Sequence, residues 1–287
     1  MPASPGDTVL RYSAFSSSPE GGNPAGVVLD GQELTDHEML AIAKRVGYSE
    51  TAFLTGREDE QRTYDVRYFS AEAEVPFCGH ATVAAAVALA ERDGPGALSF
   101  HIGAGPVPVN TTVDEAGRIT ATLTSVTPEV FDVTDDDLTE SLELIDWSRN
   151  DLDHSLPPRI AYAGARHLIL AAATRDRLSR LDYDFDGLKS LMLRLDLTTV
   201  DLVWRERADH FHARDPFPVG GVVEDPATGA AAAAFGAYLR EIGAVTPPAR
   251  VRVLQGEDMG RPSELLIDID ANRQEISVTG TAVVIAA

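Results

Sequence analysis

Cysteine occurs only once in the 287 residues, at Cys78, which excludes an internal disulfide framework and a cysteine-rich metal site. Basic residues are also scarce, because 24 lysines and arginines stand against 45 aspartates and glutamates, a net charge of −21. A surface of that charge repels nucleic acid and anionic membranes, although solubility or an acidic proteome explains the charge equally well. Long apolar runs are missing too. The longest, residues 81–90, falls well short of the roughly 20 residues that span a membrane.

The first residues of the chain lack the basic segment followed by an apolar segment that marks a secretory signal. We therefore expect a cytoplasmic protein with no nucleic-acid or membrane partner. The length is enough for one large or two medium domains with a substantial core.

The most informative stretch reads Val-Pro-Phe-Cys-Gly-His-Ala-Thr, from Val75 to Thr82, and runs into an alanine-rich segment that ends near Arg92. It predicts a strand end, a tight turn that carries a thiol and an imidazole, and then a helix. That helix is apolar on nearly every face, so we expect it to be buried on all sides. The first backbone N–H groups of such a helix point into the interior and attract a carboxylate.

The chain contains a second version of this stretch, from Gly221 to Gly229, which also leads into a run of alanines. Arg67 and Arg214 are 147 positions apart, and so are Cys78 and Asp225. The constant offset predicts two lobes of one design, each with a buried central helix, facing each other across a cleft. A chance match of two alanine-rich helices is the alternative interpretation.

Periodicity, caps and turn residues predict the remaining elements. We expect further helices at residues 35–46, 138–144 and 185–193. We expect strands at residues 9–15, 27–29, 48–54, 63–69, 98–102, 107–113, 119–124, 166–170, 199–204, 211–214, 250–255, 263–268 and 275–286. The first lobe is expected to cover residues 1–126 and the second lobe residues 127–275.

The two motif turns are the candidate site, with Cys78 and His80 on one side of a bound carboxylate and Asp225 on the other. Such a site can remove a proton from carbon and return it elsewhere without a cofactor. Glu50 is a further candidate base, because a carboxylate among apolar strand residues has a raised pKa unless it is paired. Each residue also has a structural interpretation: Glu50 on a strand surface, His80 as a helix cap, Asp225 before Pro226 as an N-cap, and Cys78 as a small core residue.

Taken together, five motifs in this order resemble the PhzF, or phenazine-biosynthesis-like, family. They are Gly22-Asn23-Pro24-Ala25-Gly26-Val27, Ser49-Glu50-Thr51-Ala52-Phe53, Arg67-Tyr68-Phe69, Phe77-Cys78-Gly79-His80-Ala81-Thr82 and Glu224-Asp225-Pro226-Ala227-Thr228-Gly229. The resemblance implies an α+β, diaminopimelate epimerase-like fold of two pseudo-symmetric lobes, each a curled and mostly antiparallel sheet around a central helix. It also implies that the C-terminal strand, about residues 276–287, can join the first lobe, and that the protein is a homodimer.

The resemblance implies that Glu50, His80 and Asp225 are catalytic and that neither a metal nor a cofactor is needed. The substrate is then a small carboxylate like trans-2,3-dihydro-3-hydroxyanthranilate, in which Glu50 moves a proton from one ring carbon to another. The residues implied to contact this substrate are Asn23, Ser49, Cys78, Gly79, Gly229 and Ala230.

The chain departs from the family pattern at one position, because the second motif usually continues Gly-Ser-Ala and this chain has Ala230 in place of the serine, which removes one expected hydrogen bond to the substrate. Two other functions stay open. The first is an amino-acid epimerase or racemase that uses one thiol, Cys78, together with Asp225. The second is a non-catalytic protein that binds a small molecule.

Overall fold

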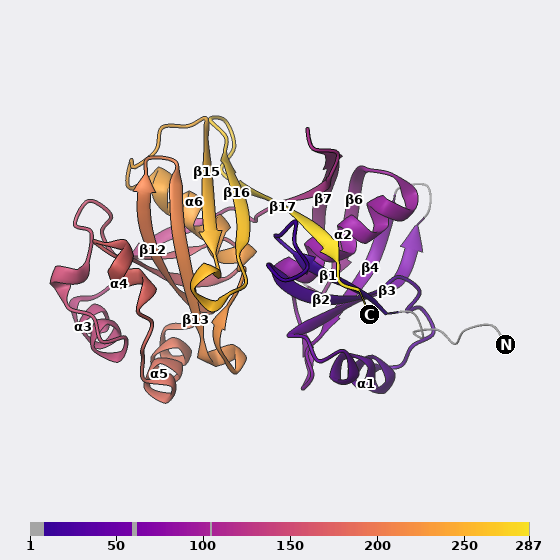
Figure 1. The fold of residues 1–287 in the computed structure, drawn as a ribbon, viewed down its shortest axis with the longest axis horizontal. Helices are drawn as coiled ribbons and strands as arrows, with labels where there is room; N and C mark the ends of the chain where they lie inside the picture. The colour runs from indigo at the N-terminus through magenta and orange to yellow at the C-terminus, as the bar shows by residue number, and fades with distance from the viewer. Residues whose placement is uncertain (1–8, 59–61, 104, 287) are drawn as a thin grey trace. The chain divides into compact units, whose positions relative to one another are not determined.

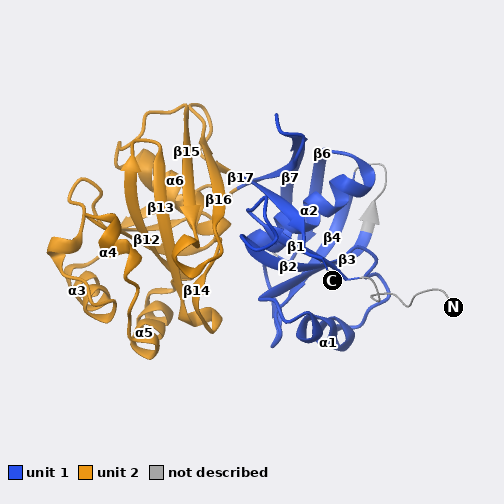
Figure 2. Ribbon diagram, in the orientation of Figure 1, with its two compact units in different colours: residues 1–124, 279–287 blue, residues 125–278 orange. Residues whose placement is uncertain are grey.

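The computed structural model describes residues 9–58, 62–103 and 105–286, and the chain divides into two compact units (Figures 1 and 2). Unit 1 comprises residues 1–124 and 279–287, and unit 2 comprises residues 125–278. Residues 1–5, on which the expectation of no signal segment rests, lie outside the described residues. In the described ranges, no helix is long and apolar enough to cross a membrane.

Unit 1 is a sheet wrapped around one helix. Its elements are β1 (Leu10–Ala14), β2 (Asn23–Val28), α1 (Asp36–Val46), β3 (Glu50–Glu58), β4 (Thr63–Phe69), β5 (Glu74–Val75), α2 (Gly79–Asp93), β6 (Gly96–Ile102), β7 (Gly105–Val113), β8 (Ile119–Thr124) and the end of β17 (Ile276–Val284). The strands pair in the order β1, β2, β3, β4, β6, β7, β8 and β17, and β17 pairs back to β1. The sheet is therefore closed, and α2 packs inside it against β1, β2, β3, β7 and β8.

Unit 2 repeats this plan around a second helix. Its elements are β9 (Glu129–Asp132), α3 (Asp135–Leu144), β10 (Arg159–Tyr162), β11 (Arg166–Ala171), α4 (Arg175–Ser179), α5 (Phe185–Leu195), β12 (Thr199–Arg207), β13 (His210–Phe217), β14 (Val222–Asp225), α6 (Gly229–Glu241), β15 (Ala249–Gln255) and β16 (Ser263–Ile269). The strands pair in the order β9, β10, β11, β12, β13, β15 and β16, with parallel pairs at β11–β12 and β13–β15. Helix α6 packs against β9, β10, β11 and β16.

The two central helices are buried because their sequences are apolar all round. Every residue of α2 from His80 to Ala90 is buried, and so is every residue of α6 from Ala231 to Leu239. A helix that is apolar on all faces can only be stable inside a core. The repeated arrangement that the 147-residue offset predicts is confirmed, since each unit presents a long strand, a short strand and then the buried helix in the same order.

The outer helix α1 has the caps that its sequence predicts. The Thr35 hydroxyl accepts a hydrogen bond from the Glu38 N–H, and the Glu38 carboxylate accepts the Thr35 N–H at 2.8 Å. At the other end Gly47 takes a left-handed conformation, with φ of 75°. This helix covers β3 and β4 with Met39, Ile42 and Val46, and it thereby supports the strand that begins at Glu50.

Three short elements were missing from the sequence prediction, namely β9, β10 and α4. Strands of four residues and a helix of five carry too little periodicity to be recognised, and their place is set by packing in unit 2. Helix α3 also begins earlier than residue 138, because Thr134 caps it by accepting the Asp137 N–H.

Candidate active site

Three reactive side chains meet at one point of unit 1, where β3 begins and α2 starts. Glu50 is the first residue of β3, Cys78 is the N-cap residue of α2, and His80 lies in the first turn of α2. Helix α2 packs against β3, so the start of the helix is held beside the strand that carries Glu50. The structure thus brings Glu50 together with two residues that follow it by 28 and 30 positions in the sequence.

The three groups lie within contact distance of one another. The Cys78 Sγ is 3.5 Å from Glu50 Oε2 and 3.4 Å from His80 Nδ1, and His80 Nε2 is 3.3 Å from Glu50 Oε2. The side chains of His80 and Glu50 are only 7% and 17% exposed, so these contacts are largely shielded from water. A carboxylate, an imidazole and a thiol in mutual contact form an acid–base system that can accept, hold and return a proton.

Two further residues of the sequence prediction flank this cluster. The Ser49 hydroxyl is 3.3 Å from His80 Nε2, which gives the ring a neutral hydrogen-bond partner. Asn23 is buried, 1% exposed, at the start of β2, two residues before Ala25, which pairs with Glu50. Gly22 before it has φ of 65°, and a Cβ there would lie 2.3 Å from the Ala14 carbonyl oxygen, so only glycine fits the turn that delivers Asn23.

The same cluster contains a set of atoms that could hold a metal ion. Glu50, Cys78 and His80 each offer one ligand atom, and the three atoms lie within 4.8 Å of one another. A thiolate, an imidazole and a carboxylate are ligands that zinc accepts. The same short distances also result from hydrogen bonding within the cluster.

In unit 2 the corresponding turn carries Asp225, at the end of β14 and half-buried. The Thr228 hydroxyl donates to Asp225 Oδ2 at 2.6 Å. Gln255 on β15 braces both, because its amide Nε2 donates to the Asp225 carbonyl at 2.8 Å and to the Thr228 hydroxyl at 3.1 Å, and its Oε1 accepts the Thr228 N–H at 3.0 Å. Asp225 therefore has a fixed orientation, with one carboxylate oxygen committed to Thr228.

The N-terminal ends of the two buried helices contain the other residues predicted to bind substrate. Gly79 is the first residue of α2, and Gly229 and Ala230 are the first two residues of α6. All three are partly accessible. The first amides of a helix have no partner within the helix and carry the positive end of its dipole, so each of these ends suits a carboxylate.

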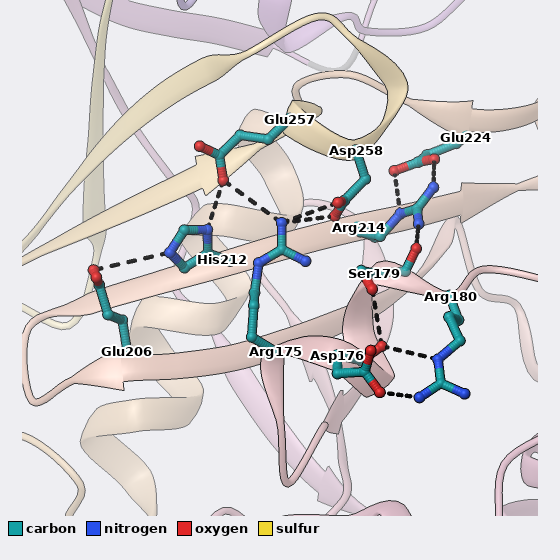
Figure 3. Close-up of polar contacts among 10 residues, drawn as sticks. All are labelled: Arg175, Asp176, Ser179, Arg180, Glu206, His212, Arg214, Glu224, Glu257 and Asp258. Carbon is teal, nitrogen blue, oxygen red and sulfur yellow. Dashed lines mark hydrogen bonds and ion pairs between the residues drawn. The ribbon is translucent and has the colours of Figure 1, made fainter.

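The strand pair under Asp225 is held by a buried ion pair. Arg214 on β13 donates to both carboxylate oxygens of Glu224 on β14, at 2.9 and 2.5 Å, and to the Ser179 carbonyl at 2.7 Å (Figure 3). The loop after Gln255 is also anchored, since Glu257 accepts a hydrogen bond from His212 at 2.6 Å. These contacts tie β13, β14 and the loop after Gln255 to the neighbouring elements.

Thr228 and Gln255 were not predicted as site residues. Thr228 lies in the quoted motif and could have been recognised by its hydroxyl beside an aspartate. No sequence pattern marks Gln255 as a site residue, because it is 30 residues from Asp225 and reaches it only through the parallel pairing of β13 and β15.

The family model for phenazine biosynthesis-like proteins matches residues 12–287 of this chain. An uncharacterized isomerase of Bacillus subtilis is 32% identical over 286 residues, which cover 96% of this chain and 95% of the relative. The trans-2,3-dihydro-3-hydroxyanthranilate isomerase of Pseudomonas fluorescens is 27% identical over 266 residues, which cover 92% of this chain and 91% of the relative.

Solved structures agree with these relatives. A phenazine biosynthesis protein of the PhzF family from Bacillus anthracis has a TM-score of 0.86 and 28% identity, covering 97% of this chain and 96% of its own. A probable proline racemase from Agrobacterium radiobacter has a TM-score of 0.66 at 12% identity, covering 97% and 91%, and shows likeness of fold alone. The predicted α+β fold of the diaminopimelate epimerase type is confirmed.

Proposed function

Because the chain belongs to the family of phenazine biosynthesis-like proteins, we propose that it is a cofactor-independent isomerase that moves a proton between two carbons of a small carboxylate. The observation that carries the proposal is the contact of Glu50, His80 and Cys78, three groups that exchange protons, at the start of α2. The relative that acts on trans-2,3-dihydro-3-hydroxyanthranilate supports a substrate of that kind.

In this proposal Glu50 is the base and then the acid. It is shielded from water, and among the described residues its ion-pair partner is the imidazole of His80 and not an arginine or a lysine. His80 contacts Glu50 and Ser49, and so orients the carboxylate and holds the polar groups of the substrate. Asp225 binds the amine of the substrate, and the amides at Gly79, Gly229 and Ala230 bind its carboxylate.

A second candidate reaction is favoured by the position of Cys78. Its sulfur touches both an imidazole and a carboxylate, and a neighbouring base activates a thiol as a carbon base. An epimerase that uses Cys78 and Asp225 would exchange the α-hydrogen of an amino acid.

Both reactions leave a deuterium label on carbon, so we would incubate the protein in D2O with 2,3-dihydro-3-hydroxyanthranilate and, separately, with a panel of amino acids. The expected result is deuterium uptake at carbon together with rearrangement of the ring, both detected by NMR. In Glu50→Gln we expect turnover to fall by a factor of about 10² to 10⁴, the usual contribution of a general acid–base. The matched control is Glu33→Gln, which changes an exposed glutamate of unit 1 and should retain full turnover.

Two outcomes would contradict the isomerase. Uptake only at the α-carbon of an amino acid, abolished by Cys78→Ala and kept by Glu50→Gln, would establish the epimerase instead. Binding of the carboxylate by calorimetry without any exchange would make the protein a non-catalytic binder.

A further inference from the structure

Beneath the candidate site, unit 2 buries two carboxylates and an imidazole that the proposed reaction does not use. Asp201 on β12 is 2% exposed, Asp215 on β13 is 1% exposed, and His167 on β11 is fully buried. Charged side chains are rarely buried this deeply unless they are paired or neutralised. The cluster therefore requires an explanation.

The strand register places the two buried aspartates in one row with Asp225. Asp215 and Asp225 are direct partners across β13 and β14, so their side chains lie on the same face of the sheet. Leu202 is the partner of Arg214, and the next pair in that register sets Asp201 opposite Asp215. Three aspartates thus occupy neighbouring positions on three adjacent strands, and Asp215 is the middle one.

Hydrogen bonds fix Asp215 in the row. The Thr199 hydroxyl donates to Asp215 Oδ1 at 2.8 Å, and the same hydroxyl oxygen lies 2.8 Å from His167 Nδ1. Asp215 Oδ2 and His167 Nε2 are buried without a hydrogen-bond partner in the described part of the chain. Thr228 has a single hydroxyl proton, and that proton goes to Asp225 Oδ2.

No cation faces Asp215 among the described residues around it. The groups on its face of the sheet are Asp201 from β12, Asp225 from β14 and, through Thr199, His167 from β11, while β15 contributes the uncharged Gln255. The phenol of Tyr238 on α6 interacts with Asp201 and with the cations Arg159 and Arg205, and neither the phenol nor either arginine interacts with Asp215. Arg214 is adjacent in sequence, but strand alternation turns it to the opposite face, where Glu224 holds it.

The protonation states follow from burial. Burial raises the pKa of Asp215 well above its usual range, and the charges of Asp201 and Asp225 add to this, while the hydrogen bond from Thr199 acts in the opposite direction. Burial also raises the pKa of Asp201 to about 7 and lowers the pKa of His167 to about 3. The raised pKa favours the uncharged form of Asp215, and in that form Oδ2 is the oxygen available to carry the proton because Oδ1 accepts the Thr199 hydroxyl.

Unit 1 has a neutral hydroxyl at the equivalent position. Tyr68 precedes Asp215 by the 147 residues of the repeat, as Cys78 precedes Asp225. Tyr68 is buried, its hydroxyl is 2.7 Å from the Thr82 hydroxyl, and Thr82 donates to the Cys78 carbonyl at 2.6 Å. In both units an uncharged O–H group on the long strand thus lies behind the motif turn and its reactive residue.

We propose that Asp215 is a positioning residue of the isomerase, a neutral carboxylic acid behind Asp225 that leaves Asp225 as the single negative charge at the start of α6. An ionised Asp215 would set a second negative charge directly opposite Asp225 and would compete for the Thr228 proton. The inference rests on the proposed role of Asp225 in binding the substrate.

The first test needs no substrate and asks whether Asp215 is neutral in the folded protein. A carboxyl whose folded pKa lies above its unfolded value of about 4 destabilises the fold progressively as pH rises from that value through the folded pKa. We therefore expect the Tm of the wild type to fall between pH 5 and 8, and to fall less steeply in Asp215→Asn. The control Asp182→Asn removes an exposed carboxylate of unit 2 and should follow the wild type.

The second test measures kcat/KM against pH with the substrate that the isomerase assay identifies. We expect the wild type to lose activity on the alkaline side as the buried pair ionises, and Asp215→Asn to retain activity to higher pH. Asp215→Leu, which leaves the Thr199 hydroxyl without its acceptor, should lower kcat/KM by about ten-fold, the effect of one broken buried hydrogen bond.

The two tests separate the ways in which the inference can fail. If the Tm of Asp215→Asn depends on pH as steeply as that of the wild type, Asp215 is not neutral and the proposal is overturned. If its Tm profile flattens but its kcat/KM profile stays that of the wild type, Asp215 stabilises the fold without positioning Asp225. Absence of turnover in the wild type, with a flattened Tm profile in the variant, would overturn the proposed function and leave the neutral acid established.

Discussion

An arginine at the same place in each unit shows how strongly burial affects the contribution of an ion pair to stability. Arg67 on β4 and Arg214 on β13 are related by the repeat, and each binds a glutamate of the following short strand through two nitrogen atoms. The side chains of Arg67 and Glu74 are 30% and 45% exposed, whereas those of Arg214 and Glu224 are 9% and 4% exposed. Exposed pairs contribute little, but removal of one partner of a buried pair leaves an uncompensated charge.

We therefore expect Arg214→Met to lower the free energy of unfolding by about 3 to 5 kcal/mol, and Arg67→Met to lower it by about 1 kcal/mol or less. Urea denaturation of both variants would measure the difference. The double variant Arg214→Met/Glu224→Leu should recover much of the lost stability, because it also removes the carboxylate that Arg214→Met leaves buried and unpaired. Equal losses in the two single variants would show that burial does not set the strength of these pairs.

At the scale of elements, the two buried helices are rich in alanine because the sheets curl closely around them. In α6, a Cβ on Gly236 would lie 2.6 Å from the Ile267 Cγ2 and 2.9 Å from the Ile276 Cγ2. Helix propensity alone favours alanine over glycine by about 1 kcal/mol at such a position. The two effects are opposed, and contacts this short cannot be accommodated without movement of the sheet.

We expect packing to prevail, so that Gly236→Ala lowers the free energy of unfolding by about 1 to 3 kcal/mol, as overpacked cores do. Thermal and urea unfolding would measure it. Adding Ile267→Leu removes the closer methyl group at constant volume, and this double variant should recover part of the loss. A Gly236→Ala protein more stable than the wild type would contradict this account.

At the scale of the whole molecule, the dominant feature is the excess of negative charge, −21 over 287 residues. Like charges repel within the folded chain more than in the expanded one, and salt screens them, since the Debye length falls from about 10 Å at 0.1 M to about 3 Å at 1 M. Attractive pairs such as Arg67–Glu74 are screened as well, but carboxylates outnumber cations almost two to one.

The Tm should therefore rise as potassium chloride is increased from 0.05 to 1 M. Differential scanning calorimetry would measure the rise, with sucrose of equal osmolality as the control for general solute effects. A Tm that is constant or falls with salt would show that ion pairs, and not net repulsion, dominate the electrostatics of the fold.

Much of the fold follows from local signals in the sequence. The capping box at Thr35 and the glycine at Gly47 define α1, and alternation defines β4 at its observed ends. The apolar, alanine-rich segments of the sequence predict α2 and α6, and the repeat predicts that the two units share one arrangement of elements. These features are local because caps, periodicity and turns depend on residues a few positions apart.

The sequence alone placed Cys78, His80 and Asp225 at the starts of buried helices and Glu50 on a strand of apolar residues, and the family motifs added their proposed roles. Only the tertiary structure decided which groups touch: Glu50 reaches His80 because β3 packs beside α2, and Gln255 reaches Asp225 because β13 and β15 pair in parallel. The burial of Asp201 and Asp215 could not be predicted from the sequence either, since a strand pattern shows which residues alternate between faces but not what covers each face. Contacts between strands distant in sequence depend on register and packing, and local patterns do not specify either.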